Sequence, residues 1–202
     1  MTHVVLYAFD SMADWEYGPL AGALGHLRSS GIAVDLIVAG DSTAEVTTFG
    51  GLRLRPEYSL SELDPAHIDM LVLPGGNTWH TRHDSVLGLA ADRLSRDQPV
   101  AAICGATLGL ARRGLLDTRR HTSNNAEFLA ESGYRGGALY EEARVVVDGP
   151  LITAPGTSPL EFTRETLVAS GLMNKEAAHA WHQMYTTGDP SWGGRLMAAL
   201  RG

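Results

Sequence analysis

The chain has 202 residues, of which 44% are hydrophobic and 19% charged, a composition typical of one globular domain. We therefore expect a single domain over residues 1–202. The formal net charge is −7 and the basic residues form no long run, which disfavours nucleic-acid binding. No apolar stretch approaches the roughly 18 residues of a transmembrane helix, so no membrane partner is expected.

A single cysteine cannot form an internal disulfide bond, which indicates a reducing compartment. The N-terminal run M-T-H-V-V-L-Y-A-F-D is typical of a first strand, because it lacks the charged segment and long apolar stretch of a signal peptide. Both observations predict a cytoplasmic protein.

Strand-like and helix-like segments alternate along the chain. The predicted strands are 3–9, 32–39, 69–76 and 99–103. The predicted helices lie within 12–27, at 84–96 and from 105 onward. Near-continuous apolar strands that alternate with helices predict an α/β fold, with a mostly parallel sheet covered on both faces.

Turn residues divide the remaining segments. Hairpins are predicted at 46–55, around Gly50–Gly51, and at 145–154, around Asp148–Gly149. The segment 117–150 is less regular. Two or three helices close the chain, with breaks at Gly171 and Asp189–Pro190.

The only cysteine, Cys104, lies in the run V-A-A-I-C-G-A-T-L-G-L (100–110), where a strand-like segment changes directly to a helical one. A residue at such a junction projects from the sheet, at the N-terminus of the new helix. This arrangement is a nucleophile elbow. Because the helix N-terminus favours the thiolate, we expect a lowered thiol pKa and a nucleophilic Cys104. The alternative is a small buried hydrophobic residue.

Glu16 follows the first predicted strand, in the run D-S-M-A-D-W-E-Y-G-P (10–19). Beside Trp15 and Tyr17 and near a thiolate, its carboxyl group would be desolvated and would face a like charge. Both effects raise a carboxyl pKa, so we expect a protonated Glu16 that bonds to sulfur and moves a proton in catalysis. The alternative is a solvated carboxylate at a helix start.

The loop P-G-G-N-T-W-H (74–80) follows another predicted strand. The adjacent Gly75 and Gly76 allow close approach of the backbone to a ligand. With the N–H groups of Gly105 and Ala106, they are predicted to form an oxyanion site. The candidate pocket residues are Trp15, Asn77, Trp79, His80 and Asn124. The alternative is an ordinary turn at a strand end.

The histidine pairs His80–His83 and His179–His182 have spacings that can bind metal. No cysteine or carboxylate pattern supports either pair, so we predict no metal site and no cofactor. His121, in R-R-H-T-S-N-N (119–125), is a candidate neighbour of the site.

Together these segments resemble the ThiJ/PfpI family of the class I glutamine-amidotransferase-like superfamily. The resemblance rests on D-W-E (14–16), D-M-L-V-L-P-G-G (69–76), A-A-I-C-G-A-T (101–107), G-L-L-D (114–117) and L-I-T-A-P-G-T-S-P-L-E-F (151–162). It implies a flavodoxin-like three-layer sandwich, Cys104 as nucleophile and Glu16 as its carboxyl partner. Relatives are commonly dimeric, so a homodimer is expected, with Trp181 or Trp192 as a candidate interface aromatic. The alternative is that these tryptophans pack the terminal helices onto the sheet.

The sequence departs from the family pattern in two places. Glutamine amidotransferases carry a histidine after the last strand, whereas G-T-S-P-L-E-F (156–162) has none, which argues against glutamine hydrolysis. Many relatives also place a histidine after the cysteine or in the next strand-end segment. Here Gly105 and Asn124 fall at those positions. Glu16 is therefore the expected acid/base, and proteolysis is disfavoured.

The sequence thus predicts a cysteine-dependent hydrolase, lyase or hydratase that acts on a small electrophilic molecule. The substrate would be a reactive carbonyl, as for glyoxalases and deglycases, or an isonitrile, as for isonitrile hydratases. The alternative is a redox sensor or stress-response protein without turnover, in which Cys104 is oxidised to a sulfinate held by Glu16.

Overall fold

The computed structural model describes residues 1–201, and its centre is a seven-stranded sheet with the order β5-β2-β1-β6-β7-β9-β8. The strands are β1 (Thr2–Tyr7), β2 (Val34–Gly40), β5 (Tyr58–Ser59), β6 (Met70–Leu73), β7 (Val100–Ile103), β8 (Val146–Asp148) and β9 (Leu151–Ala154). Neighbouring strands run parallel, apart from β8, which is antiparallel to β9. The mostly parallel sheet predicted from the sequence is confirmed.

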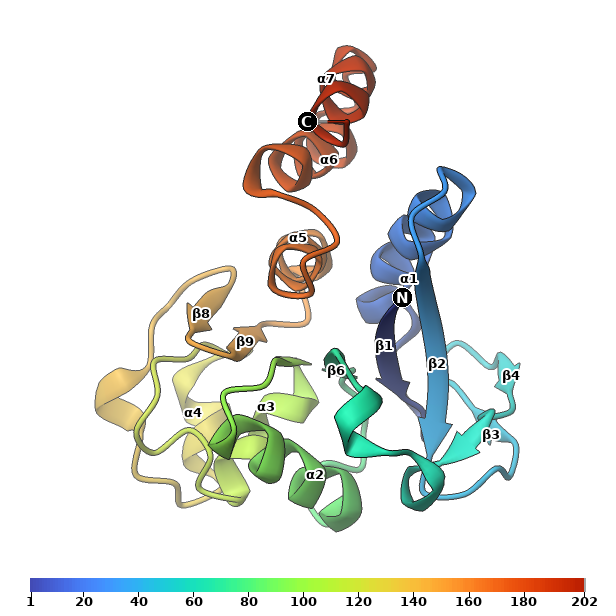
Figure 1. Ribbon diagram of the computed structural model, residues 1–202. Helices are drawn as coiled ribbons and strands as arrows, with labels where there is room; N and C mark the ends of the chain where they lie inside the picture. The colour runs from blue at the N-terminus through green and yellow to red at the C-terminus, as the bar shows by residue number, and fades with distance from the viewer. Residues whose placement is uncertain (202) are drawn as a thin grey trace.

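Helices cover both faces of this sheet (Figure 1). One face carries α1 (Asp14–Ser29) and α5 (Pro159–Ala169), and the other carries α2 (Asp84–Ser95), α3 (Gly105–Arg112) and α4 (Ala126–Ala130). Outside α5 lie α6 (Lys175–Thr187) and α7 (Ser191–Ala199). These three layers confirm the flavodoxin-like sandwich.

The central strands are continuously apolar because both of their faces are covered. Every residue of β6, Met-Leu-Val-Leu, and of β7, Val-Ala-Ala-Ile, is buried. The last four residues of β1 are buried in the same way. These strands form a packed base for the loops that follow them.

The hairpin predicted at 46–55 is confirmed, and it lies apart from the main sheet. Its two short strands, β3 (Val46–Thr47) and β4 (Arg53–Leu54), form a separate sheet. The tip of this hairpin is fixed to the start of α1, because the Gly50 N–H donates to Asp14 Oδ2 at 2.6 Å. The edge strand β5 and the 3-10 helices η1 (Leu60–Glu62), η2 (Pro65–His67) and η3 (Gly137–Leu139) are too short to give a periodic signal in the sequence.

One of the two C-terminal tryptophans differs from expectation. Trp181 is only 2% exposed and packs in the core, so its proposed place at a subunit interface is wrong. Trp192 is partly buried, and the Arg195 guanidinium lies 4.3 Å from its ring centre. In the described part of the chain, no helix has the length and apolar composition needed to cross a membrane.

The sheet order places a switch point at β1, which has β2 on one side and β6 on the other. In open parallel sheets, ligands bind at such a point, beyond the C-terminal ends of the strands. Because β1, β6, β7 and β9 are successive neighbours, the loops that follow them meet at one edge of the sheet. Cys104, Glu16 and the Gly75–Gly76 loop all follow these strands.

Candidate active site

Cys104 occupies the sharp turn between β7 and α3. Its φ of 57° and ψ of −122° are rare for a residue other than glycine and store roughly 1–3 kcal/mol of strain. The Cys104 N–H donates to the Ala154 carbonyl at 2.9 Å, and the Thr107 hydroxyl donates to the Cys104 carbonyl at 2.6 Å. The side chain is partly exposed at the N-terminus of α3. Cys104 therefore has the geometry of a nucleophile elbow.

Glu16 lies completely buried in the first turn of α1. Its Oε2 accepts a hydrogen bond from the Gly75 N–H at 2.5 Å, and Oε1 has no hydrogen-bond partner among residues 1–201. A Cβ on Gly75 would lie 2.7 Å from both Cys104 Cβ and Glu16 Oε2. A Cβ on Gly156 would lie 2.9 Å from Cys104 Sγ and 3.0 Å from Glu16 Oε1. The thiol and the carboxyl group are neighbours, and glycines flank the pair.

Burial controls the protonation of this pair. It raises the pKa of Glu16 to about 7, against the opposing influence of the Cys104 thiol and the Gly75 N–H. Burial, followed by the negative charge of Glu16, raises the pKa of the Cys104 thiol to about 12, although Asn124 and the Gly105 N–H act in the opposite direction. The lowered thiol pKa expected from the helix N-terminus is therefore wrong. Because a proton on Glu16 removes its charge, the thiolate forms most easily when its proton moves to Glu16.

Asn124 also binds the sulfur. Its Nδ2 donates to Cys104 Sγ at 3.3 Å, and its Oδ1 accepts the Gly156 N–H at 2.9 Å. An amide orients the sulfur but has no basic nitrogen that takes up a proton. The position where many relatives carry a histidine therefore supplies a hydrogen-bond donor and no base.

The three glycines of the expected oxyanion site have different roles. The Gly75 N–H is already bound to Glu16, so in this arrangement it supports the carboxyl group instead of a substrate oxygen. Gly76 and Gly105 lie against each other, since a Cβ on Gly105 would lie 2.8 Å from the Gly76 carbonyl oxygen and 3.2 Å from its nitrogen. The Gly76 N–H is the remaining candidate donor with no assigned partner among the described residues, and the Gly105 N–H, which faces the sulfur, is a second candidate.

Two tryptophans expected in the pocket have different surroundings. Trp15 is half-exposed, and its Nε1 donates to the Gly156 carbonyl at 3.0 Å, directly beside the site. Trp79 is buried under the elbow, against Gly105 and Gly109, and its Nε1 donates to the Pro74 carbonyl at 3.0 Å. Trp79 is therefore a core residue that supports the elbow and not a pocket wall.

Asn77 is exposed on the loop after β6, and its backbone N–H donates to the Ser11 hydroxyl at 3.1 Å. The Asn77 side chain is therefore exposed to solvent next to Gly76.

His121 does not face the sulfur. It is buried, with Nδ1 at 2.7 Å from the Arg119 carbonyl and Nε2 at 3.0 Å from the Tyr134 hydroxyl. Because a carbonyl only accepts, Nδ1 carries the proton and Nε2 accepts from Tyr134. Both nitrogens are used within the fold, so the placement of His121 beside the site is wrong.

A second buried histidine, His83, is also held within the fold. His83 is buried between the Tyr7 hydroxyl, at 2.9 Å, and the Thr78 hydroxyl, at 2.8 Å, and burial lowers its pKa to about 4. Over residues 1–201, no group of three or more histidine, cysteine or carboxylate side chains is arranged to hold a metal ion.

The loop of residues 155–158, after β9, is the part of the site that reasoning from individual residues missed. Its Gly156 lies beside the sulfur, where a Cβ would not fit, and its backbone donates to Asn124 and accepts from Trp15. The sequence contained a sign of this loop. A Pro–Gly pair follows both strands, Pro74–Gly75 after β6 and Pro155–Gly156 after β9.

These features define a class: α/β proteins with a cysteine at a strand–helix elbow and a buried carboxyl group beside it. Residues 2–169 match the DJ-1/PfpI family, and the chain belongs to that family. It is 36% identical to the protein named "Uncharacterized protease YoaZ" of Bacillus subtilis, over 98% of this chain and 97% of that protein. It is 27% identical to "Deglycase TK1284" of Thermococcus kodakarensis, over 75% of this chain and 88% of that protein.

A solved structure agrees with this assignment. The thiJ/pfpI family protein from Bacillus anthracis superposes with a TM-score of 0.90 at 37% identity, and the match covers 100% of this chain and 99% of that chain. The resemblance seen in the sequence is confirmed, and the family supports a cysteine-dependent enzyme.

Proposed function

We propose that this protein is an enzyme that acts on small molecules with an electrophilic carbon, with Cys104 as the nucleophile and Glu16 as the proton-transfer group. The observation that carries the proposal is the position of a fully buried Glu16, with a pKa raised to about 7, against the elbow cysteine. A carboxyl group that titrates near neutral pH can both accept and donate a proton during a catalytic cycle.

Reactive carbonyl compounds are the preferred substrate class. The relatives that carry the name deglycase favour them over isonitriles. In the first step, Glu16 takes the thiol proton while Cys104 Sγ forms a bond to the carbonyl carbon. The electrons of the C=O π bond move to oxygen, and the proton on Glu16 then neutralises that oxygen.

The surroundings of the sulfur suit this addition. The N–H groups of Gly76 and Gly105 are candidate donors to the developing negative charge on oxygen. Asn124 holds the sulfur through Nδ2. Peptide cleavage fits less well, because an amine leaving group needs a strong proton donor and Asn124 stands where an imidazole would supply one.

Replacement of the nucleophile tests this function. Cys104→Ser should lose nearly all turnover on a panel of 2-oxoaldehydes and other small carbonyl compounds, because a neutral hydroxyl is a poor nucleophile. Mass spectrometry should detect an adduct on Cys104 in the wild type. An inactive wild type in which peroxide adds oxygen to Cys104 would contradict the enzyme and favour the redox sensor.

We also propose a cytoplasmic homodimer. Trp15, Phe49 and Leu52 are large apolar side chains that are 49%, 59% and 62% exposed, and they offer surface for a second copy near the site. Sedimentation that gives a mass near 21.6 kDa at micromolar concentration would contradict the dimer.

A further inference from the structure

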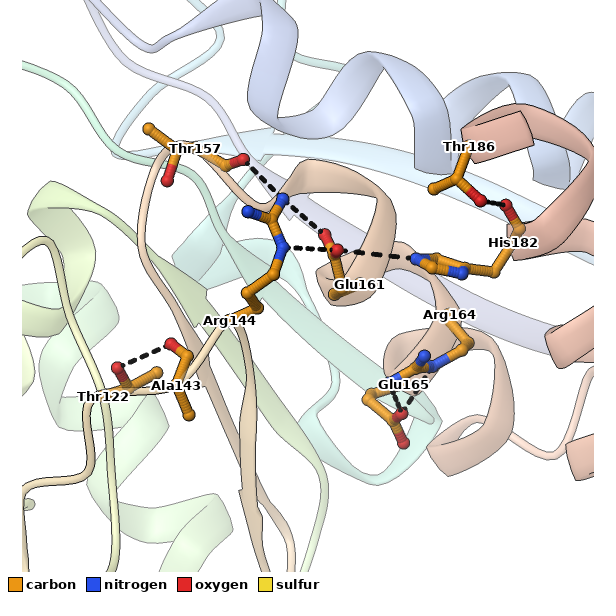
Figure 2. Close-up of polar contacts among 9 residues, drawn as sticks. All are labelled: Thr122, Ala143, Arg144, Thr157, Glu161, Arg164, Glu165, His182 and Thr186. Atoms are coloured by element: carbon orange, nitrogen blue, oxygen red, sulfur yellow. Dashed lines mark hydrogen bonds and ion pairs between the residues drawn. The ribbon is translucent and has the colours of Figure 1, made fainter. Parts of the chain in front are cut away.

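An ion pair lies beside the loop 155–158 (Figure 2). Arg144 binds Glu161 of α5 through two hydrogen bonds, Nε to Oε1 at 2.5 Å and Nη2 to Oε2 at 3.2 Å. Nη2 also donates to the Thr157 carbonyl at 3.0 Å. One guanidinium group therefore joins the segment before β8, the start of α5 and the loop that follows β9.

This pair differs from an ordinary surface salt bridge. Exposed ion pairs contribute little, because water screens both charges. Here the Glu161 side chain is only 12% exposed, whereas the Arg144 side chain is 63% exposed. Burial pushes the pKa of Glu161 up, but the opposing influences together lower it, and the hydrogen bond from Arg144 is the largest of them. Glu161 is therefore a carboxylate at neutral pH, and Arg144 is its main partner.

The histidine next to Glu161 does not replace Arg144. His182 of α6 has Nε2 at 3.6 Å from Glu161 Oε1, as Figure 2 shows. Burial and the nearby Arg164 lower the pKa of His182, although Glu161 opposes them. Neither ring nitrogen has a hydrogen-bond partner in the described chain. The ring is neutral at pH 7, so the full counter-charge of Glu161 is Arg144.

The loop held by this pair is the one that encloses the reacting groups. Gly156, the neighbour of Thr157, lies against Cys104 Sγ and Glu16 Oε1. Its N–H fixes the side chain of Asn124, which in turn binds the sulfur. A shift of the Thr157 carbonyl would therefore move Gly156 away from the sulfur.

We infer that Arg144 and Glu161 form a clasp that positions the loop 155–158 over the Cys104–Glu16 pair, so that Arg144 is a positioning residue for the chemistry proposed above. Without Arg144, the buried Glu161 loses its counter-charge and Thr157 loses a donor. The loop then loosens and water reaches Cys104. Because burial is the main cause of the raised thiol pKa, this pKa should fall.

The test measures the rate of alkylation of Cys104 by iodoacetamide as a function of pH. The chain has one cysteine, so the signal has one source, and the measurement needs no turnover. The variants are Arg144→Met, which removes the charge, and Arg144→Lys, which keeps it. Arg120→Met is the matched control, because Arg120 Nε also binds a glutamate, Glu141, at 2.6 Å but lies outside the clasp.

In Arg144→Met, the midpoint of the pH profile should move down toward the free-cysteine value of roughly 8.5. With a carbonyl substrate, kcat should fall roughly ten- to hundredfold, with a smaller change in KM, because the reacting groups are misplaced. Arg144→Lys should recover part of both effects, and Arg120→Met should change neither.

An Arg144→Met profile equal to that of the wild type would overturn the clasp. If Arg144→Met does not fold, the same pH profile of alkylation is measured in Glu161→Gln, which keeps the shape of the side chain. Its midpoint should also move down, and an unchanged midpoint would overturn the clasp. The clasp and the proposed function can fail separately. If the alkylation profile of Arg144→Met is shifted but the wild type turns over no substrate, the clasp is supported and only the proposed function is contradicted.

Discussion

Two buried glutamates, Glu16 and Glu161, occupy equivalent places in the fold but have opposite properties. Each lies in the first turn of a helix, and these helices, α1 and α5, cover the same face of the sheet. Burial raises the pKa of Glu16 to about 7, whereas the pKa of Glu161 is lowered. The difference is Arg144, which binds Glu161 and has no equivalent at Glu16.

This comparison shows that a counter-charge, and not burial by itself, decides what a buried carboxyl group can do. Glu16 is bound by one neutral donor, the Gly75 N–H, and remains able to change its charge near neutral pH. Glu161 is held in its charged form and anchors the loop 155–158. Both residues lie next to the same loop. Glu16 lies beside Gly156, and Glu161 binds Arg144, which donates to the Thr157 carbonyl.

The largest expected difference between the two glutamates is in turnover. Glu16→Gln should lower kcat by roughly 10²–10⁴-fold, because it removes the proton-transfer group but keeps the shape. Glu161→Gln should cost much less, because it perturbs only the loop. Steady-state kinetics on a carbonyl substrate measures both, with Cys104→Ser as the baseline. Equal losses in the two variants would show that Glu16 has no special role in proton transfer.

The second difference is in the pH dependence of stability. The folded-state pKa of Glu16, about 7, lies above the ordinary glutamate pKa of 4.5, so its contribution to stability is fully present below about pH 4.5 and is lost as pH rises through 7. The loss is about 3 kcal/mol of unfolding free energy, from the size of this shift. Urea unfolding of the wild type and Glu16→Gln at pH 4.5 and 8 measures it. A difference between the two proteins that does not change with pH would contradict the raised pKa.

Glu161 should show the opposite dependence. Its lowered folded-state pKa gives stability that is present above the unfolded pKa and is lost as pH falls through the folded value. The effect should be about 1 kcal/mol, because water screens the exposed Arg144 side chain. The stability gap between wild type and Glu161→Gln, measured by urea unfolding, should shrink from pH 7 to pH 3. A difference in unfolding free energy that grows as the pH is lowered would contradict the lowered pKa of Glu161.

The smallest effect concerns the third attachment of the loop. Trp15→Phe removes the hydrogen bond from Nε1 to the Gly156 carbonyl and should cost about 0.5–1 kcal/mol of unfolding free energy. Thermal unfolding measures this cost, and iodoacetamide alkylation reports the access to Cys104. Trp15→Phe should alter alkylation less than Arg144→Met does. A larger change would make Trp15, and not the clasp, the principal support of the loop.

The fold could be predicted from the sequence because its signals are local. The apolar runs at 69–76 and 99–103 become β6 and β7, and the elbow at Cys104 follows from a strand that changes to a helix within one residue. The convergence of Cys104, Glu16 and the Gly75 loop follows from the rule for strand ends in parallel sheets. Asn124 was placed by the family pattern, and the structure brings it to the sulfur.

Other features depend on contacts that the sequence does not encode locally. Trp79 and His121 carry chemical groups suited to a pocket, but neither lies in it. Trp79 packs under the elbow, and His121 is bound to Arg119 and Tyr134. The helix N-terminus predicted a lowered thiol pKa, whereas the depth of burial and the charge of Glu16 raise it. Desolvation depends on every neighbouring element at once, so no single segment reveals it.

The sequence by itself determined the layers of the fold, the elbow and the identity of the residue that forms it, because hydrophobic periodicity and turn residues act over short distances. The tertiary structure alone decided which of the buried glutamates is neutralised by an arginine. Arg144 and Glu161 are distant from Glu16 in the chain, and only the packing of α1, α5 and the loop after β9 brings their effects to one sulfur atom.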